Sequence, residues 1–285
     1  MVRALWQLLR EAVEAFIEDD ALSRGASISF YTVTSLGPVL FIVVGVGGLA
    51  FGAEAARGAL TCELGGLMGR ESAELIQAVL KNAAVEGRGG VASLVGAFIL
   101  LITASGVFGE MQLALNVIWK AELKGSTVTR LVRARVVSLG LVAALGFLLM
   151  VSLVVSALLA GFADYINRAL PFGALLLEVV NFIVSFLLIA VLFAAIYKVL
   201  PDVRLAWRDV VVGAIVTALL FNLGKSLIAL YLSQSAIASS YGAAGAVIIL
   251  LLWIYYSTQI FLLGAELTKV YARRRGVQAA ARAMA

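Results

Sequence analysis

Four charged side chains lie within stretches of the sequence that are otherwise apolar enough for a bilayer. They are Glu110, Glu178, Lys225 and Glu266. A charge in hydrocarbon is costly, so such residues face the interior of a bundle or a watery cavity, where they pair with one another or with a polar ligand. These four residues are therefore the first candidates for chemistry.

Lys225 and Glu178 are predicted to meet near the outer surface of the membrane. Counted along two antiparallel helices, they lie roughly 10 Å and 5 Å below that surface. Asn181 lies on the turn after Glu178, and Asn222 lies one turn from Lys225 on the same helix face. The set is either a structural ion pair with a snorkelling lysine, or a cationic contact for an anionic headgroup or solute.

Glu110 and Glu266 are predicted to lie at a similar depth in the inner half of the membrane, because the helices that carry them both run inward. One interpretation is that they pair with cytoplasmic arginines such as Arg24 or Arg204. The other is proton coupling, since removal from water favours the neutral form of a carboxyl group. The sequence leaves both interpretations open.

The first apolar stretch carries several hydroxyl side chains and an internal proline. It contains "SRGASISFYTVTSLGP", in which Ser35 precedes Pro38 by three residues. Proline removes a backbone donor and clashes with the preceding turn, so a kink with a free carbonyl near Thr34 is expected. Hydroxyl groups beside a kink indicate a pathway lining, although hydrogen bonds between helices account for them almost as well.

The composition indicates a membrane protein. Of the 285 residues, 62% are hydrophobic and 14% are charged, against roughly 45–50% and 25% in soluble domains. Long apolar runs without strand-like alternation predict an all-α, polytopic membrane protein. We expect six transmembrane helices, at about 29–51, 91–118, 136–160, 175–199, 209–232 and 244–267.

Several classes of function are disfavoured. The sequence has no histidine and one cysteine, Cys62, so an intrachain disulfide, the usual zinc sites and a Ser-His-Asp triad are all excluded. The phosphate-binding pattern G-x-x-x-x-G-K-[ST] does not occur, and the basic residues form no patch with interleaved aromatics. We therefore expect no enzyme activity, no cofactor, no metal and no nucleic-acid partner.

The basic residues predict the orientation. Lys and Arg are concentrated in the N-terminal segment, two loops and the C-terminal segment, which places both termini in the cytoplasm. The predicted organisation is an amphipathic cytoplasmic helix over 1–28, a transmembrane domain over 29–267 and a basic tail over 268–285. The N-terminal helix is expected on the inner membrane surface or packed under the bundle. Residues 52–90 are expected to form a small helical cap on the outer side.

Four segments resemble the YihY/BrkB family of bacterial inner-membrane proteins. They are "ISFYTVTSLGPVLFIV", "GVFGEMQLALNVIWKA", "YKVLPDVRLAWRDVVVGAIVTALLF" and "YGAAGAVIILLLWIYYSTQIFLLGAELTKVYA". Their order and spacing match the family over about residues 20–272. The resemblance implies a six-helix protein of the inner membrane, and among family-like positions it points to Tyr31, Ser35, Pro38, Asn116, Tyr241 and Glu266.

The resemblance favours transport as the function. Some relatives have been linked to the movement of lipids or lipid-like envelope components, whereas an older ribonuclease label finds no support in this sequence. The leading hypothesis is a transporter or flippase-like carrier of an anionic lipid or related amphiphile. The alternative is a non-transporting scaffold that docks an envelope partner protein through residues 52–90.

Overall fold

The structure is a computed structural model, and the described part of it is helical. It describes residues 2–52, 54, 58, 106–121, 140, 151, 161, 173–203, 205–234 and 243–284. Three of its helices are long and apolar enough to cross a membrane, over Leu175–Val199, Trp207–Ile228 and Val247–Gly276. The helical membrane class is thus supported, while the count of six remains a prediction, because 91–105 and nearly all of 136–160 lie outside the described residues.

The N-terminal segment forms two helices rather than one. Helix α1 (Val2–Glu18) ends at a turn, and α2 (Ala21–Phe51) begins directly after it. Asp20 has a φ of 55°, a left-handed conformation that Asp tolerates better than most residues. Its side chain accepts a hydrogen bond from Ser23. Helix α2 therefore begins before the span predicted from about residue 29, because the turn falls at the paired acids Asp19 and Asp20.

Helix α2 continues without interruption through Pro38. The hydroxyl groups of Ser29 and Thr32 donate to the backbone carbonyls of Gly25 and Ile28, one turn earlier, at 2.6 and 2.7 Å. These hydroxyl groups are therefore satisfied within their own helix, which is neither of the roles considered from the sequence. The side chain of Pro38 lies outside the described residues.

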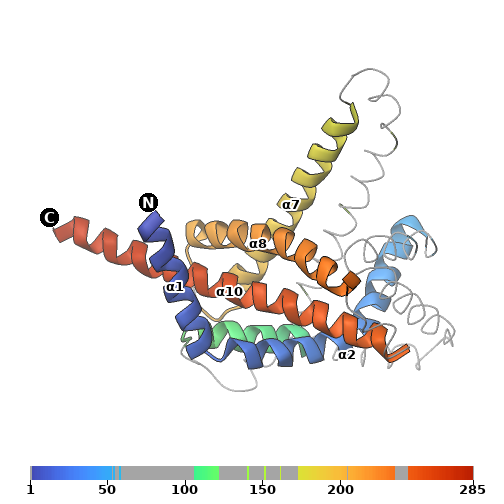
Figure 1. Cartoon of the computed structure of the whole chain (residues 1–285), viewed down its shortest axis with the longest axis horizontal. Coiled ribbons are helices and arrows are strands. Elements are labelled where there is room, and N and C mark those ends of the chain that lie inside the picture. Colours follow the sequence, from blue (N-terminus) through green and yellow to red (C-terminus); the bar gives the residue numbers. More distant parts are fainter. Residues whose placement is uncertain are drawn as a thin grey trace.

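Helices α8 (Trp207–Gln234) and α10 (Ala243–Met284) pack closely in antiparallel directions (Figure 1). Glycines make the approach possible. A Cβ at Gly213 would lie 1.7 Å from Oγ1 of Thr268, and one at Gly264 would lie 2.0 Å from Oγ1 of Thr217. Small residues at such contacts let helix backbones come together in lipid.

Helix α7 (Gly173–Val199) joins this pair through aromatic side chains at its C-terminal end. Tyr197 is fully buried, stacks on Phe261 at 5.4 Å and donates a hydrogen bond to the carbonyl of Phe261. Its hydroxyl is also 3.1 Å from that of Thr217 on α8. The N-terminal part of α7 extends away from this core (Figure 1), and its exposed Phe182 and Leu187 are suited to lipid.

The C-terminal residues continue α10 as far as Met284, so the described part of the predicted basic tail is helical. Its arginines are held by acids of two other helices. Arg274 lies 2.6 Å from Glu11 of α1, and Arg275 lies 2.9 Å from Asp209 of α8. Helix α1 crosses α10 in this region (Figure 1).

Candidate functional site

A polar pocket lies between the start of α2 and a short helix over Gly106–Ile118, the green helix of Figure 1. We call it the Arg24 pocket. It has a volume of about 210 Å³. It is lined by Asp20, Ser23, Arg24, Ser27, Glu110 and Ala114.

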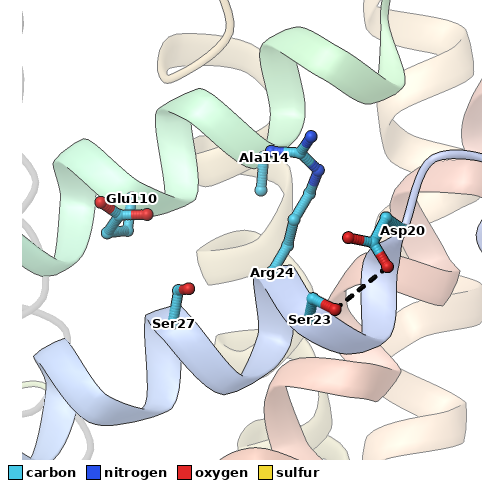
Figure 2. A pocket seen from close by; sticks show the side chains of 6 residues that line it. All are labelled: Asp20, Ser23, Arg24, Ser27, Glu110 and Ala114. Atoms are coloured by element: carbon cyan, nitrogen blue, oxygen red, sulfur yellow. Dashed lines mark hydrogen bonds between the residues drawn. The ribbon is translucent and has the colours of Figure 1, made fainter.

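Arg24 supplies the cation of this pocket. Its Nε donates a hydrogen bond of 2.9 Å to the backbone carbonyl of Asp19, which fixes the side chain at the turn between α1 and α2. Figure 2 shows its guanidinium group reaching toward the 106–118 helix near Ala114. Glu110 and Ser27 lie further along the same space. The pocket therefore combines a guanidinium group with hydroxyl groups and carboxylates.

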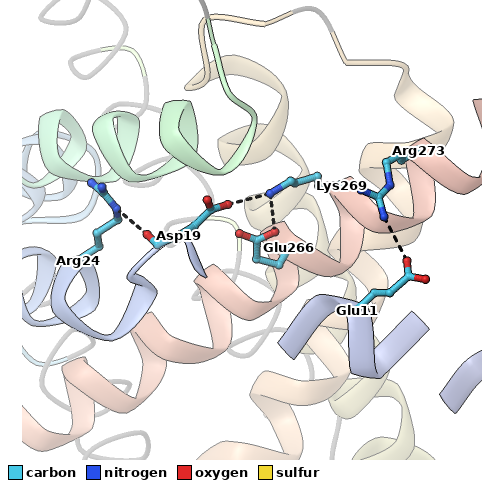
Figure 3. Close-up of polar contacts among 6 residues, drawn as sticks. All are labelled: Glu11, Asp19, Arg24, Glu266, Lys269 and Arg273. Carbon is cyan, nitrogen blue, oxygen red and sulfur yellow. Dashed lines mark hydrogen bonds and ion pairs between the residues drawn. The ribbon is translucent and has the colours of Figure 1, made fainter. Parts of the chain in front are cut away.

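A second polar cluster lies on the other side of the same turn. Nζ of Lys269 is 2.8 Å from Oδ2 of Asp19 and 3.0 Å from Oε2 of Glu266 (Figure 3). The side chain of Glu266 is fully buried. Within the described residues, its second oxygen, Oε1, has no hydrogen-bond partner. Lys269 therefore neutralises two carboxylates and satisfies Glu266 through one oxygen.

The electrostatic setting of Asp19 follows from its position between the two helices. Partial burial by itself would raise the pKa of this carboxyl group, but the hydrogen bond and charge of Lys269 outweigh burial. The net result is a pKa below the usual value for an aspartate, so Asp19 is ionised at neutral pH.

Glu110 and Glu266, both predicted for the inner half of the membrane, lie at the same end of the bundle. Glu110 lines the Arg24 pocket, and Glu266 is linked to it through Lys269, Asp19 and the backbone contact of Arg24. Of the two interpretations left open for Glu266, ion pairing gains support, and the cation beside it is Lys269, three residues later on α10. For Glu110 the expected neighbour, Arg24, shares its pocket.

Two other family-like positions lie in the first half of α2. Ser35 is buried. Tyr31 is 40% exposed, and its ring lies beside Gly106, where a Cβ would be 3.4 Å from Cδ1 of the tyrosine. Tyr31 therefore contributes to the contact between α2 and the 106–118 helix.

Asn116 has a structural partner. Its amide group donates to Oδ2 of Asp202 at 2.8 Å and accepts from the backbone N–H of Asp202 at 2.8 Å. Gln112 donates to the same carboxylate at 3.2 Å. Both ends of the Asn116 amide thus hold the connection that follows α7, and the interpretation of Asn116 as a ligand contact gains no support.

Lys225 and Glu178 were predicted to meet near the outer surface of the membrane, but the structure does not bring their backbones to one level. Rings of Phe193 and Phe221 meet at 5.8 Å, which sets the register of α7 against α8. Lys225 lies one turn beyond Phe221, whereas Glu178 lies about four turns before Phe193. The two backbones are thus offset by roughly 16 Å along the helix axes. This register does not support the predicted common level, although the side chain of Glu178 lies outside the described residues.

The other residues predicted for the site lie in different surroundings. Asn181 is exposed on α7, and Asn222 is buried and donates to the carbonyl of Ala218 in its own helix. Lys225 is half-buried on α8. Tyr241, Cys62 and most of the predicted cap over 52–90 lie outside the described residues.

Sequence reasoning missed the residues that organise the end of the bundle where Glu266 lies. Asp19 and Asp20 were counted as part of one amphipathic helix, although two adjacent acids followed by Ser23 are typical of a helix start. Lys269 was assigned to the tail, although its spacing of three residues from Glu266 places both on one helix face. Those two signals could have located the turn and the ion-pair cluster.

Comparison with known proteins supports a location in the membrane. The chain matches the family Virulence factor BrkB over residues 12–285. A UPF0761 membrane protein of Pseudoalteromonas translucida is 28% identical over 260 residues, covering 88% of this chain and 81% of the relative. One from Cronobacter sakazakii is 34% identical over 199 residues, covering 66% and 62%. One from Yersinia pestis is 34% identical over 184 residues, covering 62% and 58%. No solved structure matches.

The fold and the Arg24 pocket define a helical membrane protein with a polar site at one end of its bundle. The chain belongs to the virulence factor BrkB family, which confirms the resemblance seen in its sequence.

Proposed function

We propose that this protein moves an anionic lipid or a related envelope amphiphile across the bacterial inner membrane. The Arg24 pocket is the observation that carries the proposal, because it places a guanidinium group and two hydroxyl groups at one end of an apolar helical bundle. Such a pocket suits a headgroup whose acyl chains remain in the bilayer beside it.

The chemistry of Arg24 favours a phosphate. A guanidinium group presents planar, paired N–H donors that match two phosphate oxygens, and it stays charged at any physiological pH. Because Nε of Arg24 already donates to the carbonyl of Asp19, the terminal amino groups are the ones that would bind a ligand. Ser27, exposed in the pocket, would add a hydroxyl contact.

Two carboxylates limit which anion fits. Asp20 and Glu110 line the pocket with Arg24, so a second negative charge on the headgroup would be repelled. The pocket therefore suits a headgroup with a single phosphate rather than a polyanion. This is the charge of a common anionic phospholipid.

We place this pocket at the cytoplasmic leaflet, with both termini in the cytoplasm. The supporting observation is the group of basic residues at the same end, Arg273, Arg274 and Arg275 on α10. Excess positive charge marks the cytoplasmic side of membrane proteins. Lys225, toward the other end of α8, remains a proposed contact for the headgroup in the outer leaflet.

The proposed activity needs neither catalysis nor a cofactor. It is a carrier function, and its partner is membrane lipid. The scaffold alternative depends on the segment 52–90, which is almost entirely outside the described residues, and no described contact favours it.

Lipid movement by the reconstituted full-length protein tests the proposal. Proteoliposomes would carry fluorescent phosphatidylglycerol in both leaflets, and dithionite would destroy the outer-leaflet signal. We expect the wild-type protein to bring inner-leaflet lipid outward faster than protein-free vesicles do. Arg24→Gln should slow this movement because the cation for the phosphate is lost.

Arg10→Gln is the matched control, since Arg10 is an exposed cation of α1 whose partner is Glu14 in the same helix. It should leave the rate unchanged. A wild-type rate equal to that of empty vesicles, or an Arg24→Gln rate equal to wild type, would overturn the proposal.

A further inference from the structure

Helix α1 carries more apolar surface than the bundle covers. Trp6, Leu9, Val13 and Ile17 are 69%, 41%, 46% and 67% exposed. With 3.6 residues per turn, these four positions fall within an arc of roughly 80° on the helix. We call this arc the α1 stripe. Scattered apolar residues on a surface are ordinary, but a continuous stripe of large ones indicates a binding surface.

The neighbouring arc of α1 faces the protein. Ala12 is fully buried against Leu267 and Val270 of α10, with Leu8 packed beside them. Phe16 packs on the main core. The apolar side of α1 is therefore divided, with one half against the bundle and the other half, the α1 stripe, uncovered within the described residues.

The orientation of α1 points to the bilayer. In Figure 1, α1 runs across α10 near the C-terminal end of its candidate span, whereas α2, α8 and α10 run along one another. A helix that crosses the spans at the end of a bundle lies parallel to the membrane plane. Contacts with α10 fix it there, because Glu11 is 2.6 Å from Arg274 and Asp19 is 2.8 Å from Lys269.

The polar edge of α1 adjoins the stripe. Arg10 and Glu14 form an exposed ion pair of 2.8 Å, and on the helix both follow directly after the arc that Ile17 ends. An apolar face bounded by charges is the pattern of a helix that lies in the interface between headgroups and acyl chains. Trp6 suits that level, because its ring is apolar while its N–H is polar.

We propose that the α1 stripe inserts into the headgroup–acyl boundary of the adjacent leaflet, so that α1 is an interfacial helix clamped between the bundle and lipid. The exposed apolar residues of the next helix favour lipid over a protein partner. Beyond the turn, Leu22 and Phe30 of α2 are 53% and 62% exposed, as expected for a bundle whose apolar side chains face lipid. This inference does not depend on the transport proposal.

The inserted helix would also position the Arg24 pocket. Helix α1 ends at the turn that carries Asp19 and Asp20, and Arg24 is held by the carbonyl of Asp19. Lipid contact along α1 therefore acts on the same turn that holds the cation of the pocket.

Collision measurements on spin labels test the insertion. In the full-length protein with Cys62→Ser, single cysteines would be placed at two stripe positions, Val13→Cys and Ile17→Cys. Glu14→Cys and Glu18→Cys are matched controls on the polar side of the same helix. Labelled protein would be reconstituted in nanodiscs of phosphatidylethanolamine and phosphatidylglycerol. Accessibility to oxygen, which concentrates in lipid, would be compared with accessibility to a water-soluble nickel complex.

We expect the ratio of oxygen to nickel accessibility to be several-fold higher at the stripe than at the controls. Equal ratios at all four positions would overturn the proposal, because the stripe would then face water. Protection from both reagents at the stripe would also overturn it, because a protein segment or a second copy would then cover α1. All four positions are exposed, so the labels should leave the fold intact, as size-exclusion profiles would check.

Discussion

Lys269 lies 3.0 Å from Glu266, one turn earlier on α10, and 2.8 Å from Asp19 at the end of α1. One ammonium group thus links two carboxylates from distant parts of the sequence at the junction of three helices. Removal of one partner from a largely buried ion pair leaves an uncompensated charge, which costs more than the pair contributes.

The first prediction concerns this ammonium group. Lys269→Met should destabilise the protein by about 3 kcal/mol, because Asp19 and Glu266 would then lie close together without a cation. Thermal unfolding in detergent, followed by near-UV circular dichroism, would measure the change. The double variant Lys269→Met with Glu266→Gln should recover part of the loss, and additive effects of the two substitutions would contradict the coupling.

The pH dependence of stability should carry a contribution from Asp19. Its pKa is lower in the folded protein than the ordinary value of 3.8, so its stabilising effect is complete above that value and is lost as the pH falls through the folded pKa. Thermal unfolding between about pH 5 and pH 2 would show this loss, since the folded pKa lies below the ordinary value. In Asp19→Asn the loss over this window should be smaller, and an unchanged pH profile would refute the assignment.

Alanine substitutions at two glycines compare a close helix contact with an open surface. Gly264→Ala should destabilise by about 1–3 kcal/mol, because its Cβ would lie 2.0 Å from Thr217 Oγ1 and 2.6 Å from the hydroxyl of Tyr197. Gly109→Ala is the control, since nothing lies within 4 Å of its Cβ position within the described residues. Comparable melting temperatures for the two variants would show that α8 and α10 do not pack as described.

The charges of the Arg24 pocket predict a substitution that strengthens lipid binding. Glu110→Gln removes a carboxylate that would repel an anionic headgroup, so binding of phosphatidylglycerol should tighten. A gain of about tenfold corresponds to about 1.4 kcal/mol. Competition between labelled and unlabelled lipid in micelles would measure it. Weaker binding in this variant would mean that Glu110 contacts the ligand or orients Arg24 instead.

Much of the architecture could be predicted from periodicity and hydropathy. The spans at 175–199, 209–232 and 244–267 have counterparts in α7, α8 and α10, because long apolar runs in lipid must be helical. The turn at Asp19 was missed because helical spacing of apolar residues continues on both sides of it. The end of α10 was missed because a basic segment after a span reads as a tail until its acidic partners, such as Glu11, are known.

The polar residues were harder to place than the helices. Depth along a helix could be counted, so Glu110 and Glu266 were expected at one end, where they lie. The register between helices could not be counted, and the register set by the contact of Phe193 with Phe221 separates the levels of Glu178 and Lys225. Partners such as Asp202 for Asn116 depend on how a loop folds back, which no local pattern in the sequence specifies.

We propose above that Arg24 holds the phosphate of a lipid headgroup. A high-resolution structure of the full-length protein in nanodiscs rich in phosphatidylglycerol would test this contact. We expect headgroup density in the pocket, with a phosphate oxygen within hydrogen-bond distance of the Arg24 guanidinium group. A pocket that holds water alone, or that is closed by a direct Arg24–Glu110 ion pair, would contradict it.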